Sequence, residues 1–152
     1  MLVNSYLEKL NINYSREEIT GYYSVDNYLT DNNLYIEVMG DYWHCNPLLY
    51  NAESKLINHI QKKNIIKDKC KHTYIKNKIG KEILYLWEYD INNNPYLCEQ
   101  LILHYTNLNG VIQNYHSFNW SIDNNQLILN DNIIIPYQDM TVGAYSDLLI
   151  DK

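Results

Sequence analysis

The segment from Val25 to His44 constrains the fold most, because it contains two strand-like stretches separated by a short turn. Tyr, Val and Leu alternate with polar residues between Gly21 and Leu29, and Leu34 to Val38 has a similar strand-forming composition. The residues between them, Thr30-Asp31-Asn32-Asn33, have turn chemistry, since Asn and Asp tolerate positive φ. We therefore predict a β-hairpin.

The position of the turn also predicts which side chains face each other. With the turn centred between Asp31 and Asn32, Asp26 lies opposite Glu37, with the two Cβ atoms about 4.5–5.5 Å apart. Two carboxylates this close repel each other, and a divalent ion such as Mg²⁺ or Mn²⁺ would remove the repulsion. A slipped register would instead leave two exposed surface acids.

The next part of the chain predicts a crossover. Residues from about Ala52 to Lys78 have apolar positions at helical spacing, and Gly80 marks the end of the helix. Glu82 to Trp87 follows as a buried strand. A right-handed crossover through the helix makes this strand parallel to the second strand of the hairpin.

The flanking segments complete the expected architecture. Ser15 to Glu18 is interpreted as a turn or a brief helical start, and a second helix runs from the Asn-Pro sequence before Tyr96 to about Tyr105. Short strands follow near 116–122, 126–129 and 133–135. We expect an α/β fold, a mixed β-sheet flanked by helices, with residues 1–110 as the core and 111–152 as a small C-terminal β extension packed on the same domain.

The distribution of charge indicates the class of partner. The net charge is −6, but nine of the 12 Lys and Arg residues lie between Lys55 and Lys81, where Asp68 is the only acid. An acidic protein with one basic segment suits a polyanion that contacts a single face, and double-stranded DNA is the expected partner. The lysines expected to contact DNA are Lys62, Lys63, Lys67, Lys69 and Lys71.

Three further residues extend the candidate site. His44 follows the second strand and has the titration range of a general base at neutral pH. Trp43 packs against the sheet or stacks on a nucleic-acid base. Asp68 positions His44 or a water molecule, or it forms an (i, i+3) ion pair with Lys71 on the same helix.

Cysteine content and hydropathy restrict the remaining possibilities. The three cysteines are odd in number and form no CxxC pair, so neither a disulfide framework nor a structural zinc site is indicated. Cys45 directly follows His44, which leaves a cysteine–histidine hydrolase as an alternative. No apolar run is long enough for a membrane span and no secretory signal is evident, so we expect a cytoplasmic protein of a bacterial or phage-infected cell.

Several of these motifs occur in an order that resembles a known group of nucleases. They are Asp26, Ile36-Glu37-Val38, Gly40-Asp41-Tyr42-Trp43-His44, Asp68 with Lys71, and Leu86-Trp87-Glu88. The pattern is similar to the very short patch repair endonucleases and the EDxHD homing endonucleases of the PD-(D/E)XK superfamily. The resemblance covers about Gly21 to Asp90.

The resemblance implies an endodeoxyribonuclease that hydrolyses phosphodiester bonds with Mg²⁺ or Mn²⁺. It implies that Asp26 and Glu37 hold the metal, that His44 is the general base, and that Asp68 is the closing acid of the motif. The lysine of the superfamily is replaced by Met39, which moves the base function to His44.

Two questions stay open at this stage. The leading glutamate of the motif normally lies on a helix before the hairpin, and the candidates Glu8, Glu17 and Glu18 stand in no convincing helical context. The aromatic side chains of the β extension either contact DNA or a second copy in a homodimer, or they simply pack against the core; they are Tyr115, His116, Phe118, Trp120 and Tyr137. A non-catalytic nuclease-like module that binds DNA or protein is the alternative function.

Overall fold

The computed structural model describes residues 2–50, 58–107 and 114–134 of the chain. A four-stranded mixed sheet has the order β1-β2-β3-β4, and a separate hairpin pairs β5 with β6. The strands of the main sheet are β1 (Tyr14–Thr20), β2 (Tyr23–Leu29), β3 (Leu34–Met39) and β4 (Glu82–Trp87). The predicted α/β class, with a mixed sheet, flanking helices and a small β extension, is confirmed.

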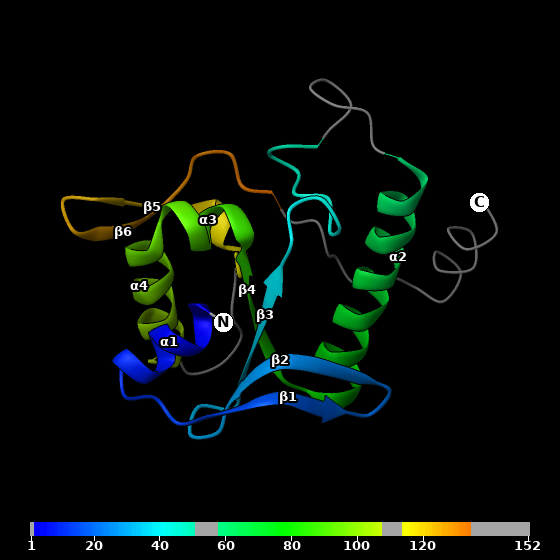
Figure 1. Ribbon diagram of the computed structural model, residues 1–152, viewed down its shortest axis with the longest axis horizontal. Helices are drawn as coiled ribbons and strands as arrows, with labels where there is room; N and C mark the ends of the chain where they lie inside the picture. The colour runs from blue at the N-terminus through cyan, green and yellow to red at the C-terminus, as the bar shows by residue number, and fades with distance from the viewer. Residues whose placement is uncertain (1, 51–57, 108–113, 135–152) are drawn as a thin grey trace.

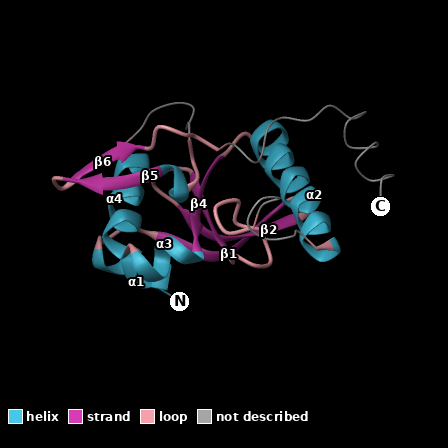
Figure 2. Ribbon diagram, turned by 90° about the horizontal axis from the view of Figure 1, so that it is seen from above, coloured by secondary structure: helices cyan, strands magenta, loops and turns pink. Residues whose placement is uncertain are grey.

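Helices cover the two faces of the main sheet (Figure 1). α1 (Leu2–Lys9), α3 (Glu88–Asn93) and α4 (Pro95–Thr106) lie on one side, and α2 (His59–Tyr74) lies on the other. Seen from above, the β5–β6 hairpin projects beside α4, far from α2 (Figure 2). The hairpin strands are β5 (Trp120–Asp123) and β6 (Gln126–Leu129).

The hairpin formed by β2 and β3 has the predicted register. Its ladder pairs Asn27 with Ile36 and Leu29 with Leu34, as expected for a turn centred between Asp31 and Asn32. β3 and β4 are parallel along their whole length, which confirms the crossover through α2. β4 has the predicted bounds, and Gly80 ends the preceding helix with a φ of +73°.

The N-terminal region differs from the prediction. Residues 15–18 belong to the strand β1, which pairs antiparallel with β2, and are neither a turn nor a helical start. A strand with consecutive charges is possible here because β1 is an edge of the sheet, where Arg16 and Glu17 are exposed and Glu18 is half-buried. A helix, α1, precedes it and buries Val3, Tyr6 and Leu7 at helical spacing.

The helices and the C-terminal strands also differ in detail. The chain between β4 and α4 forms the additional short helix α3, and Pro95 takes the first turn of α4. The expected strand near 116–122 begins only at Trp120, after a 3-10 turn over Ser117–Asn119. Residues 133 and 134 form no strand, and residue 135 lies outside the described residues. The predicted helix is described from His59 onward, with a π-helical end over Ile75–Ile79.

Two apolar clusters lie on opposite faces of the sheet. The larger one packs α1, α3 and α4 against residues such as Ile36, Leu84 and Leu86, which are fully buried. The smaller one includes Tyr85, Trp87 and Phe118 and lies on the opposite face. Within the described ranges, no helix is long and apolar enough to cross a membrane.

Candidate active site

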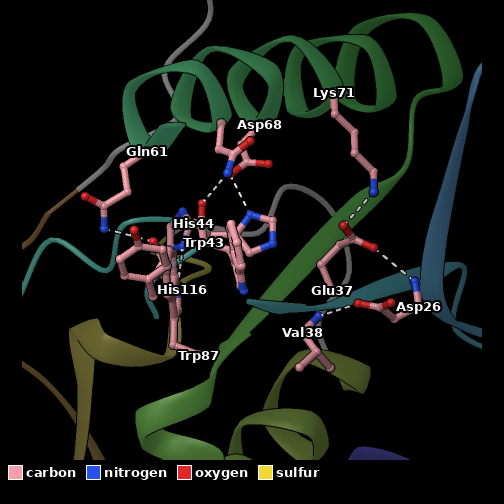
Figure 3. Close-up of polar contacts among 12 residues, drawn as sticks. Asp26, Glu37, Val38, Trp43, His44, Gln61, Asp68, Lys71, Trp87 and His116 are labelled. Carbon is pink, nitrogen blue, oxygen red and sulfur yellow. Dashed lines mark hydrogen bonds and ion pairs between the residues drawn. The ribbon is translucent and has the colours of Figure 1, made fainter. Parts of the chain in front are cut away.

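Asp26 and Glu37 face each other across β2 and β3, as the register predicted. The Asp26 amide nitrogen donates a hydrogen bond to Glu37 Oε1 at 2.9 Å, and the Val38 amide nitrogen donates to Asp26 Oδ2 at 2.7 Å. At this position the backbone amides of β2 and β3 therefore donate to side-chain carboxylates of the neighbouring strand, and the regular backbone pairing ends one residue nearer the turn, at Asn27 and Ile36. The two acids are held in place by the strands themselves (Figure 3).

Lys71 of α2 reaches across to this acid pair. Its Nζ lies 2.6 Å from Glu37 Oε2, and the exposed fractions of the two side chains are 22% and 10%. Burial raises the pKa of Glu37; the charge of Lys71 opposes this shift, and the nearby Asp26 adds to it, so that the pKa lies above its ordinary value. The ammonium group is therefore the main source of stabilisation for a charged Glu37.

A second pair joins His44, in the loop after β3, to Asp68 of α2. His44 Nδ1 lies 2.8 Å from Asp68 Oδ2, and 32% of the histidine side chain is exposed. Burial lowers the pKa of His44, but the hydrogen bond to Asp68 and the charges of Asp68 and Glu37 raise it further than burial lowers it. With Nδ1–H directed at the carboxylate, Nε2 is the basic nitrogen of the neutral ring.

The polar face of α2 holds the loop that carries His44. Gln61 Nε2 donates to the backbone oxygen of Tyr42 at 2.9 Å, and Asn64 Nδ2 donates to that of Trp43 at 2.7 Å. Asn58 begins the helix with a capping box in which Gln61 takes part. One face of α2 therefore fixes the loop, the histidine and the acid pair.

The helical spacing explains why these contacts come from one element. Gln61, Asn64, Asp68 and Lys71 lie three or four residues apart and share one side of the helix. Lys67 and Lys69, adjacent to Asp68 in sequence, are each rotated about 100° from it around the helix axis. From the sequence, Asp68 had three possible partners: His44, a water molecule or Lys71. The structure pairs Asp68 with His44, while Lys71 pairs with Glu37.

The expected DNA-contacting lysines divide into two groups. Lys62, Lys63 and Lys67 are exposed, and Lys69 is half-buried. Lys71 instead lies at the acid pair. The lysines of α2 other than Lys71 thus form a basic outer surface, defined by Lys62, Lys63, Lys67 and Lys69, which we call the α2 lysine surface.

Trp43 is the most exposed aromatic side chain of the loop after β3. Trp43 has a relative exposure of 59%, and its ring contacts the ring of Tyr42 edge-on, with the centroids 5.2 Å apart. Of the two alternatives for Trp43, this exposure favours an available ring over one that packs against the sheet.

The candidates for a leading glutamate occupy three different environments. Glu8 lies on α1, contrary to the expectation that it lacks a helix, and accepts a hydrogen bond from the Tyr14 hydroxyl at 3.0 Å. Glu18 accepts one from Ser15 at 3.1 Å. Only Glu17 lies near the acid pair: it lines a cavity of about 650 Å³ together with Asp26.

The position of Glu17 follows from strand pairing. The neighbouring pairs Arg16–Asn27 and Glu18–Val25 place Glu17 opposite Asp26, although that pair is absent from the ladder. Glu17 has a φ of +52°, which is unusual for a residue with a side chain, and the ladder with β2 is interrupted at this position. This arrangement was not predicted from the sequence, because it depends on β1 and the charged residues of β1 do not form a strand pattern.

A buried group of aromatic and histidine side chains lies on the sheet face beside the site. His116 accepts a hydrogen bond from Trp87 Nε1 through Nδ1 at 3.0 Å, and His72 Nδ1 lies 2.9 Å from the Tyr85 hydroxyl. Burial lowers the pKa of His72 to about 4 and that of His116 well below its ordinary value. His116 and its neighbour Phe118 are interior residues here and make no exposed DNA surface; Tyr137 lies outside the described residues.

Cys45 and Glu88 have structural contacts. The buried Cys45 thiol donates to the backbone oxygen of Tyr50 at 3.7 Å, and burial raises its pKa. A nucleophilic cysteine has a lowered pKa, so the structure lends no support to a thiol mechanism. Glu88 accepts a hydrogen bond from the Asp41 amide nitrogen at 3.1 Å, which helps to fix the start of the loop.

No family model matches the chain, and no curated protein matches it. Among solved structures, the chain is similar to one described as the homing endonuclease I-Bth0305I catalytic domain, with 24% sequence identity and a TM-score of 0.48. The match covers 68% of this chain and 88% of that domain.

Proposed function

We propose that this protein is a metal-dependent endonuclease of the PD-(D/E)XK type that hydrolyses phosphodiester bonds in double-stranded DNA. The observation that carries the proposal is the arrangement under one face of α2, where Lys71 pairs with the Asp26–Glu37 acid pair and Asp68 pairs with His44. Metal-binding acids and a general base are the two parts that such hydrolysis requires.

The donor set fits a particular kind of metal. Asp26 Oδ1 accepts no hydrogen bond within the described residues, so this oxygen is available as a ligand. The same residues contain no group of three or more His, Cys, Asp or Glu side chains arranged to hold an ion. Mg²⁺ is often bound by one or two carboxylates together with waters and substrate phosphates, and Mn²⁺ accepts similar oxygen ligands. Asp26 and Glu37 would hold such an ion.

His44 and Asp68 account for the proton transfer. Asp68 accepts the Nδ1 hydrogen of His44, which leaves Nε2 free to remove a proton from the attacking water. As the new phosphorus–oxygen bond forms, the bond to the leaving oxygen of the DNA strand breaks. When bound, the metal ion supplies positive charge that neutralises the phosphate and the leaving oxyanion.

The α2 lysine surface supplies the electrostatic attraction for DNA. Three of its members, Lys62, Lys63 and Lys67, are exposed on the same helix that carries Asp68, the partner of His44. A phosphate backbone that contacts α2 would therefore lie near the proposed site. Trp43 is exposed in the adjacent loop and would contact the same nucleic acid.

Plasmid nicking tests the proposed reaction. We expect the protein to nick supercoiled DNA with Mg²⁺ or Mn²⁺ and not with EDTA, and Asp26→Ala to lower the rate at least a hundredfold, since a metal ligand is lost. Asp31→Asn is a matched control, because Asp31 is an exposed acid of the same hairpin that hydrogen-bonds Asn13. Equal rates for the wild type and Asp26→Ala would refute the catalytic proposal.

A non-catalytic DNA-binding module is the second candidate. The observation that favours it is the small number of acids gathered at the site. Isothermal titration distinguishes the two: a module without catalysis binds DNA in a salt-dependent manner but shows no Mg²⁺ binding that depends on Asp26.

A further inference from the structure

Lys71 differs from the other lysines of α2 in what surrounds its charge. Its ammonium nitrogen lies 2.6 Å from Glu37 Oε2, and only 22% of its side chain is exposed. Of the members of the α2 lysine surface, Lys62, Lys63 and Lys67 are exposed and Lys69 is half-buried. The Lys71–Glu37 contact is strong because charge-assisted hydrogen bonds gain strength where water is excluded.

The contact of Lys71 with Glu37 engages the acid pair that would bind a metal ion. Glu37 Oε1 accepts the Asp26 amide hydrogen, and Oε2 accepts the ammonium group of Lys71. Both carboxylate oxygens of Glu37 are therefore engaged. A divalent ion that uses Glu37 must share an oxygen with one of these two donors.

The two competing donors differ in how easily they can leave. The Asp26 amide belongs to the backbone of β2, which is paired on both sides, so it moves only if the sheet is disturbed. The Lys71 ammonium ends a flexible four-carbon side chain on a helix and can move by side-chain rotation alone. An ammonium group and a divalent ion in contact with the same oxygen also repel each other.

We propose that Lys71 is the resident counter-ion of the Asp26–Glu37 pair and that a divalent metal ion binds there by displacing its ammonium group. The inference rests on the proposed metal site. In the metal-free protein Lys71 offsets the repulsion between the two acids, and this stabilisation is lost each time a metal ion binds. The Lys71–Glu37 ion pair thereby lowers the affinity of the protein for metal, and a stronger ion pair lowers that affinity more.

Metal titration of variants tests the proposal without DNA cleavage. We expect Lys71→Met to bind Mg²⁺ and Mn²⁺ about tenfold more tightly than the wild type, measured by isothermal titration at pH 8.5. Lys71→Arg keeps a positive charge that must still be displaced, so its affinity stays within about threefold of the wild-type value. Lys71→Gln provides a second neutral variant if the methionine variant folds poorly.

Lys76 offers a matched control. Lys76 Nζ forms an ion pair with Glu82 Oε2 at 2.5 Å, with exposed side-chain fractions of 18% and 25%, so it resembles Lys71 in burial and type of partner. Lys76→Met removes the same charge from the protein but leaves the acid pair intact. We expect its metal affinity to change less than twofold.

Thermal melting gives a second measurement. In EDTA, Lys71→Met melts at a lower temperature than the wild type, because Glu37 loses its partner. Saturating Mg²⁺ raises the melting temperature of Lys71→Met more than that of the wild type. Equal or weaker metal affinity in both neutral variants, with normal Asp26-dependent binding by the wild type, would overturn the displacement alone. Absence of Asp26-dependent metal binding in every variant would overturn the proposed metal site as well.

Discussion

His44 and His116 have the same side chain in opposite environments. His44 lies in a loop, remains partly open to solvent and pairs with Asp68, and its pKa is raised. His116 is 1% exposed and stacks between the rings of Tyr85 and Phe118, at centroid distances of 4.7 and 5.1 Å. Burial holds its pKa well below the ordinary value, with a smaller effect from His72.

The difference separates two uses of histidine in one small protein. A ring with a carboxylate on one nitrogen and solvent near the other can exchange protons near neutral pH. A ring enclosed by aromatic side chains stays neutral and contributes packing area and a hydrogen-bond acceptor for Trp87. We therefore expect substitutions at His44 to change the reaction and substitutions at His116 to change the stability.

The largest expected effect is the loss of activity in His44→Ala. Removal of the general base lowers the nicking rate by about 10²–10⁴-fold, while the melting temperature changes little because the side chain is partly exposed. His59→Ala is the control, since His59 is an exposed histidine at the start of α2. A variant His44→Ala that nicks plasmid at the wild-type rate would remove His44 from the mechanism.

His116→Ala should reverse this pattern. Loss of the buried ring leaves a cavity and an unpaired Trp87 Nε1, which lowers the free energy of unfolding by about 2–4 kcal/mol. His116→Phe keeps the stacked ring but loses the acceptor, so it should cost less, about 1–2 kcal/mol. Urea unfolding measures both variants, and the nicking rate per folded molecule should stay within about threefold. A tenfold loss of that rate with normal stability would contradict the assignment.

The sequence predicted the local part of this arrangement well. The asparagine-rich turn fixes the register of the hairpin, and with it the pairing of Asp26 and Glu37, because both depend only on residues close together in the chain. β4 was also predictable, since five of its six residues are apolar and Gly80 precedes the strand.

The missed features depend on contacts between distant segments. β1 has consecutive charged residues and no alternation, and it is a strand only because β2 provides its partner. The interior position of His116 depends on a segment about 30 residues after β4 returning to Trp87. The pairing of Lys71 with Glu37 likewise follows from the angle at which α2 crosses the sheet, which helical spacing alone does not give.

Asp68→Asn tests the comparison further, because it removes the negative charge beside His44, whereas the pKa of His116 is shifted by burial and by His72. The Asp68 hydrogen bond and charge raise the pKa of His44, so their loss lowers that pKa. A general base must be unprotonated, and activity therefore falls as pH drops through its pKa; the acid limb of the rate profile should move to lower pH in Asp68→Asn. The rate at the plateau should fall about 10–100-fold, since a less basic and less firmly oriented ring removes protons more slowly.

The double variant separates this effect from general damage to α2. If Asp68 acts through His44, Asp68→Asn should lower the rate little further in a His44→Ala background. The acid limb should then be absent from the rate profiles of both His44→Ala and the double variant. Independent losses that multiply in the double variant would show that Asp68 contributes by another route, such as holding α2 against the loop. Nuclear magnetic resonance of the His44 ring gives the decisive measurement: a pKa that does not fall in Asp68→Asn would break the link between the carboxylate and the base.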